Sequence, residues 1–140
     1  MTSIPPDFAP HFRKSPVTDA WEPVYSRKNE RSIDIGLLIA AGHCNSRGFV
    51  HGGVVATLAD NAMGLSWHQS RLASSAPAQV GALVTVTLSV DFIASGQVGQ
   101  WLQITPRVLR ETGGTGFVDA LVTADGRLIA RSNAVFRALT

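Results

Sequence analysis

The chain has 140 residues, of which 45% are hydrophobic and 16% charged, and this composition indicates a single globular domain built around one core. Its formal net charge of +2 is spread over scattered basic residues, which argues against nucleic-acid binding, because that requires a basic stripe. The only cysteine, Cys44, rules out an intrachain disulfide and a cysteine-rich metal site.

Residues 1–23 contain five prolines and little periodicity, so we expect an amino-terminal Pro-rich arm ahead of a domain of residues 24–140. The aromatic residues Phe12 and Trp21 are expected to pin this arm to the domain. The arm lacks the apolar core of a signal peptide, and no apolar run reaches the roughly 20 residues of a membrane span. We therefore expect a cytoplasmic protein that does not enter membranes.

The next part of the chain is predicted to contain two strands and one helix. Residues 23–28 and 32–41 have strand patterns, and residues 42–48 have the composition of a loop. From residue 52 to residue 67, apolar residues recur with a period of about 3.6, which predicts a helix with an unusually wide apolar face. A second loop is expected over residues 69–81.

The carboxy-terminal half is predicted to form four antiparallel strands, over residues 83–92, 100–111, 117–124 and 128–138. In the first of them, Val84, Val86, Leu88, Val90 and Phe92 alternate with Thr85, Thr87, Ser89 and Asp91, so the two sets should face opposite ways. Pro106 argues for a bulge or an edge in the second. Asp125-Gly126 predicts a hairpin turn. A lone apolar helix beside so many strands is best buried by a curved sheet that wraps round it.

Asp60 is the one carboxylate in the predicted helix. Burying a carboxylate costs several kcal/mol unless it is paired, and no Lys or Arg lies one turn away at positions 56, 57, 63 or 64. The residue could still be a structural acid that caps a neighbouring element or meets a distant arginine. An unpaired acid in so apolar a helix nevertheless indicates a site.

His51-Gly52-Gly53 stands where this helix begins. The first amides of a helix have no internal acceptor, so they can bind an anion or a developing oxyanion, and glycine lets a ligand approach closely. The glycines could also serve only to allow a sharp turn into the helix. Gly52 and Asp60 are eight residues apart, about 12 Å along a helix. If both serve one reaction, the site must be shared across a two-fold dimer.

The segment from Asn45 onward follows the pattern N-x5-H-G-G-x6-D-N, and "VTVTLSVDFIASG" and "VLRETGGTGFVDALVTADGRLIARSNAVF" follow it. Over residues 24–138 this combination resembles the hotdog-fold acyl-CoA thioesterases, closest to the phenylacetate-degradation thioesterase-like branch of the 4-hydroxybenzoyl-CoA thioesterase superfamily. The resemblance implies an α+β hotdog fold, in which an antiparallel sheet wraps round one long central helix and subunits pair back to back.

Position by position, the resemblance implies catalytic roles for Asn45, His51, Gly52 and Asp60. Asp60 would act as general base or nucleophile, and the Gly52 N–H would polarise the thioester carbonyl. Asn45 would help to place the water or the carbonyl, and His51 would support the loop by hydrogen bonding. Thr85 matches a position at which some relatives carry a hydroxyl that orients water, although it could equally be a solvent-facing strand threonine.

The substrate implied is an acyl-CoA, with no other cofactor and no metal. Gly53 and Met63 are candidate substrate-binding residues, and arginines could bind the coenzyme A phosphates. The candidate arginines are Arg71, Arg107, Arg110 and Arg131, with Arg107 and Arg110 preferred. The resemblance also implies a homodimer that forms the active site, with a dimer-of-dimers tetramer expected.

Two other readings compete with hydrolysis. A non-catalytic acyl-CoA-binding or sensing protein is the main alternative, but it would gain nothing from burying Asp60. A purely structural homodimer leaves that acid unexplained. The remaining histidines, His11, His43 and His68, lack metal-ligand spacing and are expected to be surface or local hydrogen-bonding groups. The sequence does not fix the acyl group.

Overall fold

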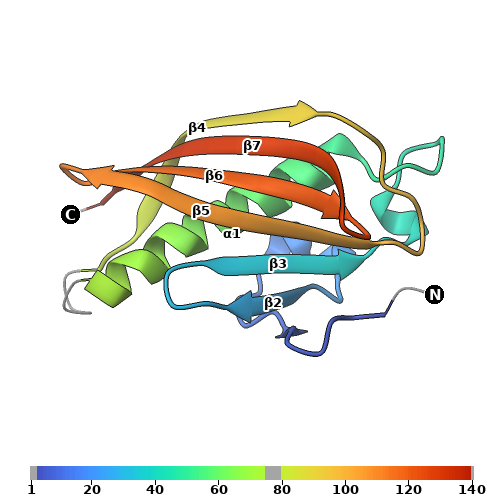
Figure 1. Ribbon diagram of the computed structural model, residues 1–140, viewed down its shortest axis with the longest axis horizontal. Coiled ribbons are helices and arrows are strands. Elements are labelled where there is room, and N and C mark those ends of the chain that lie inside the picture. The colour runs from blue at the N-terminus through green and yellow to red at the C-terminus, as the bar shows by residue number, and fades with distance from the viewer. Residues whose placement is uncertain (1–2, 75–79, 140) are drawn as a thin grey trace.

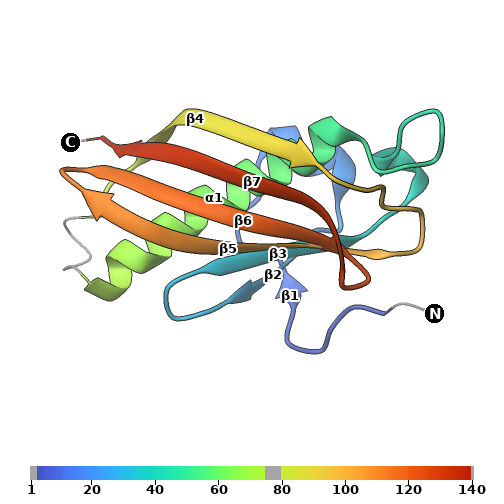
Figure 2. The same cartoon turned by 45° about the horizontal axis from the view of Figure 1, so that its top comes forward.

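The computed structural model describes residues 3–74 and 80–139, which form one seven-stranded antiparallel sheet and one long helix. The helix α1 (Gly52–Ser74) crosses one face of the curved sheet, as Figures 1 and 2 show from two directions. The sheet order is β1-β2-β3-β5-β6-β7-β4. The strands are β1 (Ala9–Pro10), β2 (Tyr25–Lys28), β3 (Ile33–Leu38), β4 (Leu83–Phe92), β5 (Trp101–Thr112), β6 (Thr115–Ala124) and β7 (Arg127–Ala138). The predicted sheet wrapped round one long helix is confirmed.

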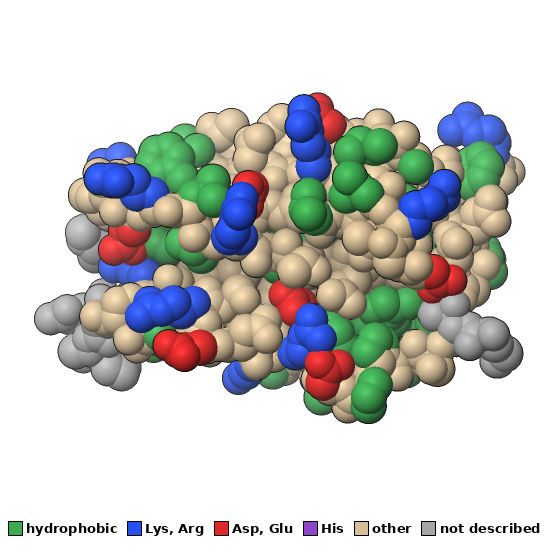
Figure 3. All heavy atoms as spheres, viewed as in Figure 1, with side chains coloured by type: hydrophobic (Ala, Val, Ile, Leu, Met, Phe, Trp, Pro, Cys, Tyr) green, Lys and Arg blue, Asp and Glu red, His purple; other side chains and the backbone are tan. Residues whose placement is uncertain are grey.

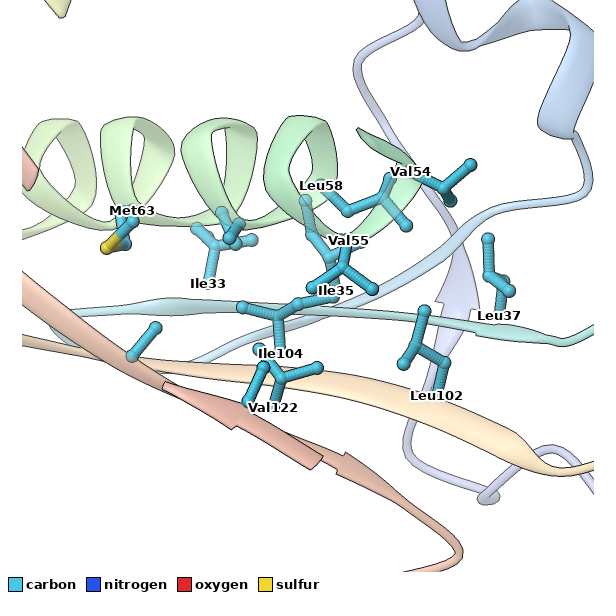
Figure 4. Packing of buried hydrophobic residues seen from close by; sticks show 14 of the residues in the cluster. Ile33, Ile35, Leu37, Val54, Val55, Leu58, Met63, Leu102, Ile104 and Val122 are labelled. Carbon is cyan, nitrogen blue, oxygen red and sulfur yellow. The ribbon is translucent and has the colours of Figure 1, made fainter. Parts of the chain in front are cut away.

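The core lies between α1 and the concave face of the sheet. The apolar face of α1 supplies Val55, Leu58 and Met63, and these pack against strand residues such as Ile35 and Ile104, all at most 2% exposed (Figure 4). The wide apolar face predicted from the sequence is therefore the face that the sheet covers. Within the described ranges, no helix has both the length and the hydrophobicity to cross a membrane.

Helix α1 ends later than predicted. It continues to Ser74, so the loop expected over residues 69–81 is wrong for residues 69–74, and residues 75–79 lie outside the described part of the chain. The extra turns are stabilised from outside the helix. Trp67 donates its indole N–H to Glu111 on β5 (2.7 Å), and the Arg71 guanidinium lies over the Trp67 ring. The helical spacing of apolar residues that predicted α1 ends at Trp67, although the helix continues to Ser74.

Strand β4 lies at the edge of the sheet and pairs only with β7 among the described strands. The predicted strict alternation is wrong at its start, because a bulge falls between Thr85 and Thr87. Thr85 is opposite the buried Phe136, on the helix side of the sheet, whereas Thr87 is opposite Val135 on the other side. Because Val86 is an extra residue in the strand, the side chains before it point to the opposite face from the one that strict alternation predicts.

The arm is attached to the body by the predicted Trp21 and by further residues that were not predicted. Phe8 is 8% exposed and packs edge-to-face against Trp101 at 5.0 Å between ring centroids, and His11 is 5% exposed. Trp21 packs against the core as expected. Phe12 is 48% exposed, and its ring contacts the ammonium group of Lys28 on β2 and the edge of His11, so it attaches the arm with little burial. The pairing of β1 with β2 joins the arm to the sheet.

Candidate active site

Asp60 lies on α1 and faces the start of β4. Its Oδ1 accepts a hydrogen bond from the Thr85 hydroxyl at 2.7 Å, a contact that exists because the bulge at Val86 turns Thr85 toward the helix. Within the described chain, no Lys, Arg or His forms an ion pair with Asp60. The carboxylate is half-buried rather than enclosed. The free-energy cost of its desolvation in the single chain is therefore smaller than the cost expected for a fully buried carboxylate.

A cleft of about 590 Å³ opens beside this carboxylate. One wall is the face of α1 that carries Asp60, Gly64 and His68. The segment that leads into β4, together with Thr85, forms a second wall, and the arm contributes Arg13. The volume falls within the range of about 300–1,000 Å³ that is typical of small-molecule sites. The carboxylate and the Thr85 hydroxyl therefore face a space large enough for a substrate.

The loop that leads into α1, residues 45–51, is held by its own hydrogen bonds. The Asn45 side-chain oxygen accepts the backbone N–H groups of Arg47 (2.9 Å) and Phe49 (3.2 Å). The Asn45 backbone N–H donates to the Phe49 carbonyl at 2.8 Å. Its oxygen is thus committed to the loop, while its NH2 group has no acceptor among the described residues. That group is a fixed donor in the loop that precedes α1.

His51 also holds this loop. Its backbone N–H donates to the His43 carbonyl, and its Nδ1 accepts the Gly53 N–H, both at 2.8 Å. Because Nδ1 is an acceptor, a neutral ring carries its proton on Nε2. The imidazole therefore fixes the first turn of the helix. Gly53 uses its N–H for this bond and has none left for a ligand.

Gly52 carries an open amide. The N–H groups of Val54 and Val55 already bond to the His51 carbonyl, but the Gly52 N–H has no acceptor in residues 3–74 and 80–139. A Cβ at Gly52 would lie 3.0 Å from the Phe92 ring, so glycine lets this ring approach closely. The amide and the helix dipole make the position suited to a partial negative charge.

One chain does not bring these groups together. Asp60 and Thr85 form one group at the start of β4. The Gly52 amide lies about 12 Å away along α1 by helix rise, beside Phe92 at the end of β4, and the Asn45 donor lies in the loop that precedes α1.

Three predicted substrate-binding residues do not line the cleft. Met63 is fully buried in the core. Arg107, 74% exposed in its side chain, pairs with Asp119 at 3.2 Å across the outer face of the sheet, the face that is turned away from α1. Arg110 is also exposed and lies on β5, three strands from β4 in the sheet order. Sequence reasoning missed Arg13, because nothing in a Pro-rich segment indicates that it folds back onto the helix.

Other titratable groups are tuned mainly by burial. Desolvation raises the pKa of the Cys44 thiol. The thiol therefore stays protonated and is a poor nucleophile. Desolvation also lowers the pKa of His68, and the positive charges of Arg13 and Arg71 lower it further. In the described part of the chain, no three His, Cys, Asp or Glu side chains are grouped so that they could hold a metal ion.

Comparisons with known proteins place the chain in a family. Residues 47–130 match the model of the thioesterase superfamily. A protein of Pseudomonas aeruginosa that is named as an esterase is 36% identical over 137 residues, 97% of this chain and 98% of the relative.

Solved structures share the fold at lower identity. A conserved protein of Pseudomonas aeruginosa has a TM-score of 0.78 at 23% identity, covering 90% of this chain and 95% of that one. A hypothetical thioesterase protein of Streptococcus pneumoniae, crystallised with coenzyme A, has a TM-score of 0.73 at 19% identity, covering 94% of each chain. The PaaI protein of the Escherichia coli phenylacetic acid degradation operon scores 0.72 at 20% identity, covering 84% and 80%.

Proposed function

Because this chain belongs to the thioesterase superfamily and has its hotdog fold, we propose that it hydrolyses acyl-CoA thioesters at a site shared between two subunits. The resemblance seen in the sequence is thus confirmed at the level of family and fold. The observation that carries the proposal is the Asp60 carboxylate, which has no cationic partner among the described residues and is bonded to Thr85 at the edge of a cleft.

The chemistry follows from the hydrogen bonds. The Thr85 hydroxyl holds Oδ1 of Asp60, which leaves Oδ2 free to take a proton from water or to attack the thioester carbon. The Gly52 amide stabilises the oxyanion that develops on the carbonyl, and the Asn45 NH2 group positions the carbonyl or the water. His51 keeps this loop in place. A thiolate is a good leaving group, so no strong general acid is required.

A two-fold dimer through β4 would join the two groups. Edge-to-edge antiparallel pairing of β4 with its copy places the end of one strand beside the start of the other. Gly52, beside Phe92 at the end of β4, would then face the Asp60–Thr85 pair of the second subunit. The inward side of β4 supports such pairing, because Leu88 is 38% and Phe92 is 58% exposed in the single chain.

The outer face of the sheet supports a further association into a dimer of dimers. Figure 3 shows hydrophobic side chains interspersed with charged ones on this face. Phe117, Leu121 and Leu128 are 40%, 54% and 40% exposed there. Arg107 and Arg110 lie on the same outer face, whereas the cleft opens on the helix side of the sheet. These two arginines could therefore contact only a coenzyme A that is bound in the cleft of another subunit. The cytoplasmic location stays a prediction.

Coenzyme A as the carrier is supported by the names of structurally similar proteins, which include a Streptococcus pneumoniae thioesterase with coenzyme A and a Streptococcus mutans protein bound to acetyl-CoA. The test is thiol release from phenylacetyl-, benzoyl-, short and long aliphatic CoA thioesters. Asp60→Asn should abolish turnover on any substrate that the wild type hydrolyses.

The control is Asp19→Asn, an equal loss of charge at an exposed position in the 3-10 helix η1 (Pro16–Trp21), away from the cleft. It should retain wild-type activity. Full activity of Asp60→Asn would contradict the assigned role of this residue. Tight binding of acyl-CoA without turnover by the wild type would instead favour the non-catalytic binding protein.

A further inference from the structure

The amino-terminal arm is fixed against the helix next to the proposed base. His11 is 5% exposed, and its Nε2 lies 3.3 Å from Oδ1 of Asn61, the residue that follows Asp60. Because an amide oxygen only accepts, His11 donates from Nε2. The His11 backbone N–H bonds to the Val24 carbonyl at 2.9 Å, so the arm is held from both sides at this level of α1. Because His11 is held in this way, the next residues of the arm begin at a fixed point beside α1.

Arg13 follows two residues later and lines the cleft together with Asp60 and His68. Asp60, Gly64 and His68 are spaced by one turn each along α1, so this wall extends about 12 Å. Arg13 and His68 line the same cleft, and the positive charge of Arg13 helps to lower the pKa of the His68 imidazole.

Among the described residues, Arg13 lacks the carboxylate partner that some of the other arginines have. Arg27 pairs with Asp34 at 2.7 Å, and Arg131 pairs with Asp91 at 2.9 Å, but Arg13 has no carboxylate partner in the described ranges. The cleft thus holds an acid, Asp60, and an unpaired cation that the arm supplies. An unpaired guanidinium in a substrate-sized cleft is suited to a carboxylate or a phosphate, which it can bind through two hydrogen bonds.

We propose, on the premise of the thioesterase function above, that the arm is a wall of the substrate cleft and that Arg13 binds an anionic group of the substrate. That group is either a carboxylate at the far end of the acyl chain or a phosphate of coenzyme A. The apolar residues that line the same cleft as Asp60 and Arg13, such as Leu65 and Leu83, would contact the uncharged part of the substrate.

The test uses substrates that separate the two sources. Adipyl-CoA and hexanoyl-CoA differ mainly by a terminal carboxylate, and the N-acetylcysteamine thioesters of the same acids lack the coenzyme A phosphates. Arg13→Gln removes the charge, and Arg13→Lys keeps it. The control, Lys14→Gln, removes the neighbouring arm cation, which pairs with Glu22 at 3.1 Å and does not line the cleft.

Arg13→Gln should lower kcat/KM on the recognised substrates by about 10-fold or more, the usual effect of losing one charge-assisted hydrogen bond. Arg13→Lys should recover part of this loss, and Lys14→Gln should change kcat/KM by less than about two-fold. A loss confined to both adipyl thioesters assigns the acyl carboxylate. A loss on both CoA thioesters but on neither N-acetylcysteamine thioester assigns a phosphate.

Equal kcat/KM for Arg13→Gln and wild type on all four thioesters would overturn the proposal, and so would an equal loss on all four, because that pattern means general damage to the fold. Calorimetric binding of adipyl-CoA to the wild type and to Arg13→Gln separates this proposal from the thioesterase function. If the wild type binds but does not hydrolyse, the proposed activity fails, and the affinity difference still tests Arg13.

Discussion

The shared site predicts opposite activities for two mixed dimers of identical composition. Asp60→Asn removes the proposed base. Gly52→Pro removes the proposed oxyanion donor, and it breaks no hydrogen bond in the described structure, because the Gly52 N–H has no acceptor there. Proline is tolerated in the first turn of a helix, where α1 begins. Gly52→Ala is the matched control, since it adds the same Cβ near Phe92 but keeps the N–H.

The magnitudes follow from the arrangement of the groups. Each homodimer of a single variant should lose most of its activity, by about 10²–10³-fold for Gly52→Pro. In a trans dimer, one subunit carries Asp60→Asn and the other carries Gly52→Pro. One of its two sites then combines an intact Asp60 with an intact Gly52 from the partner, so activity per dimer should be about half that of wild type. In a cis dimer, one subunit carries both substitutions, and both sites are damaged.

The assay co-expresses two differently tagged subunits, isolates the mixed dimers through both tags, and measures thiol release per dimer on the best substrate. We expect about half of wild-type activity in trans and almost none in cis. A site formed within one chain reverses both results, with almost no activity in trans and about half in cis. That reversal would refute the reasoning from helix length.

Three further predictions concern single residues. Thr85→Val removes the hydroxyl that holds Asp60 at 2.7 Å, so kcat should fall by about 10-fold while Thr85→Ser stays close to wild type, as measured by thiol release. Ser66→Ala deprives the buried Ile33 N–H of its acceptor at 2.9 Å and should cost about 1–3 kcal/mol in urea unfolding; a cost near zero would contradict this. Burial lowers the pKa of His11 below its ordinary value of 6.5, so the unfolded chain binds the proton more readily. The stability contributed by neutral His11 is thus complete above about pH 6.5 and is lost as the pH falls toward the folded-state pKa. In a plot of the urea midpoint against pH, His11→Gln should therefore reduce the slope between about pH 7.5 and 5.5.

The sequence predicted those parts of the fold that are encoded by local periodicity. The apolar face of α1, the strands and the Asp125-Gly126 hairpin each depend on a short pattern, and the burial of the helix follows from the width of its face. The end of α1 was not predictable in this way. Its last turns depend on Trp67 and Arg71 contacting Glu111, which lies on a strand far along the chain.

The pairing of Asp60 with Thr85 was only partly predictable. Both residues were named as candidates, but the alternation of β4 put Thr85 on the face that carries Thr87, away from the helix. Periodicity assumes an unbroken ladder, whereas a bulge is set by the neighbouring strand, here β7. Arg13 shows a second limit, because the position of an arm depends on contacts such as that of His11 with Asn61, which no local pattern records.

Strand β4 connects the proposed chemistry to the proposed assembly. It lies at the sheet edge, and its start contacts Asp60 through Thr85 while its end covers Gly52 with Phe92. An edge strand with exposed apolar side chains tends to pair with another chain, and Val86 at the bulge is 60% exposed. Pairing with a second copy would cover this surface and, in the same step, bring the two halves of the site together. On this reasoning a separated subunit would retain every catalytic side chain and still lack a complete site.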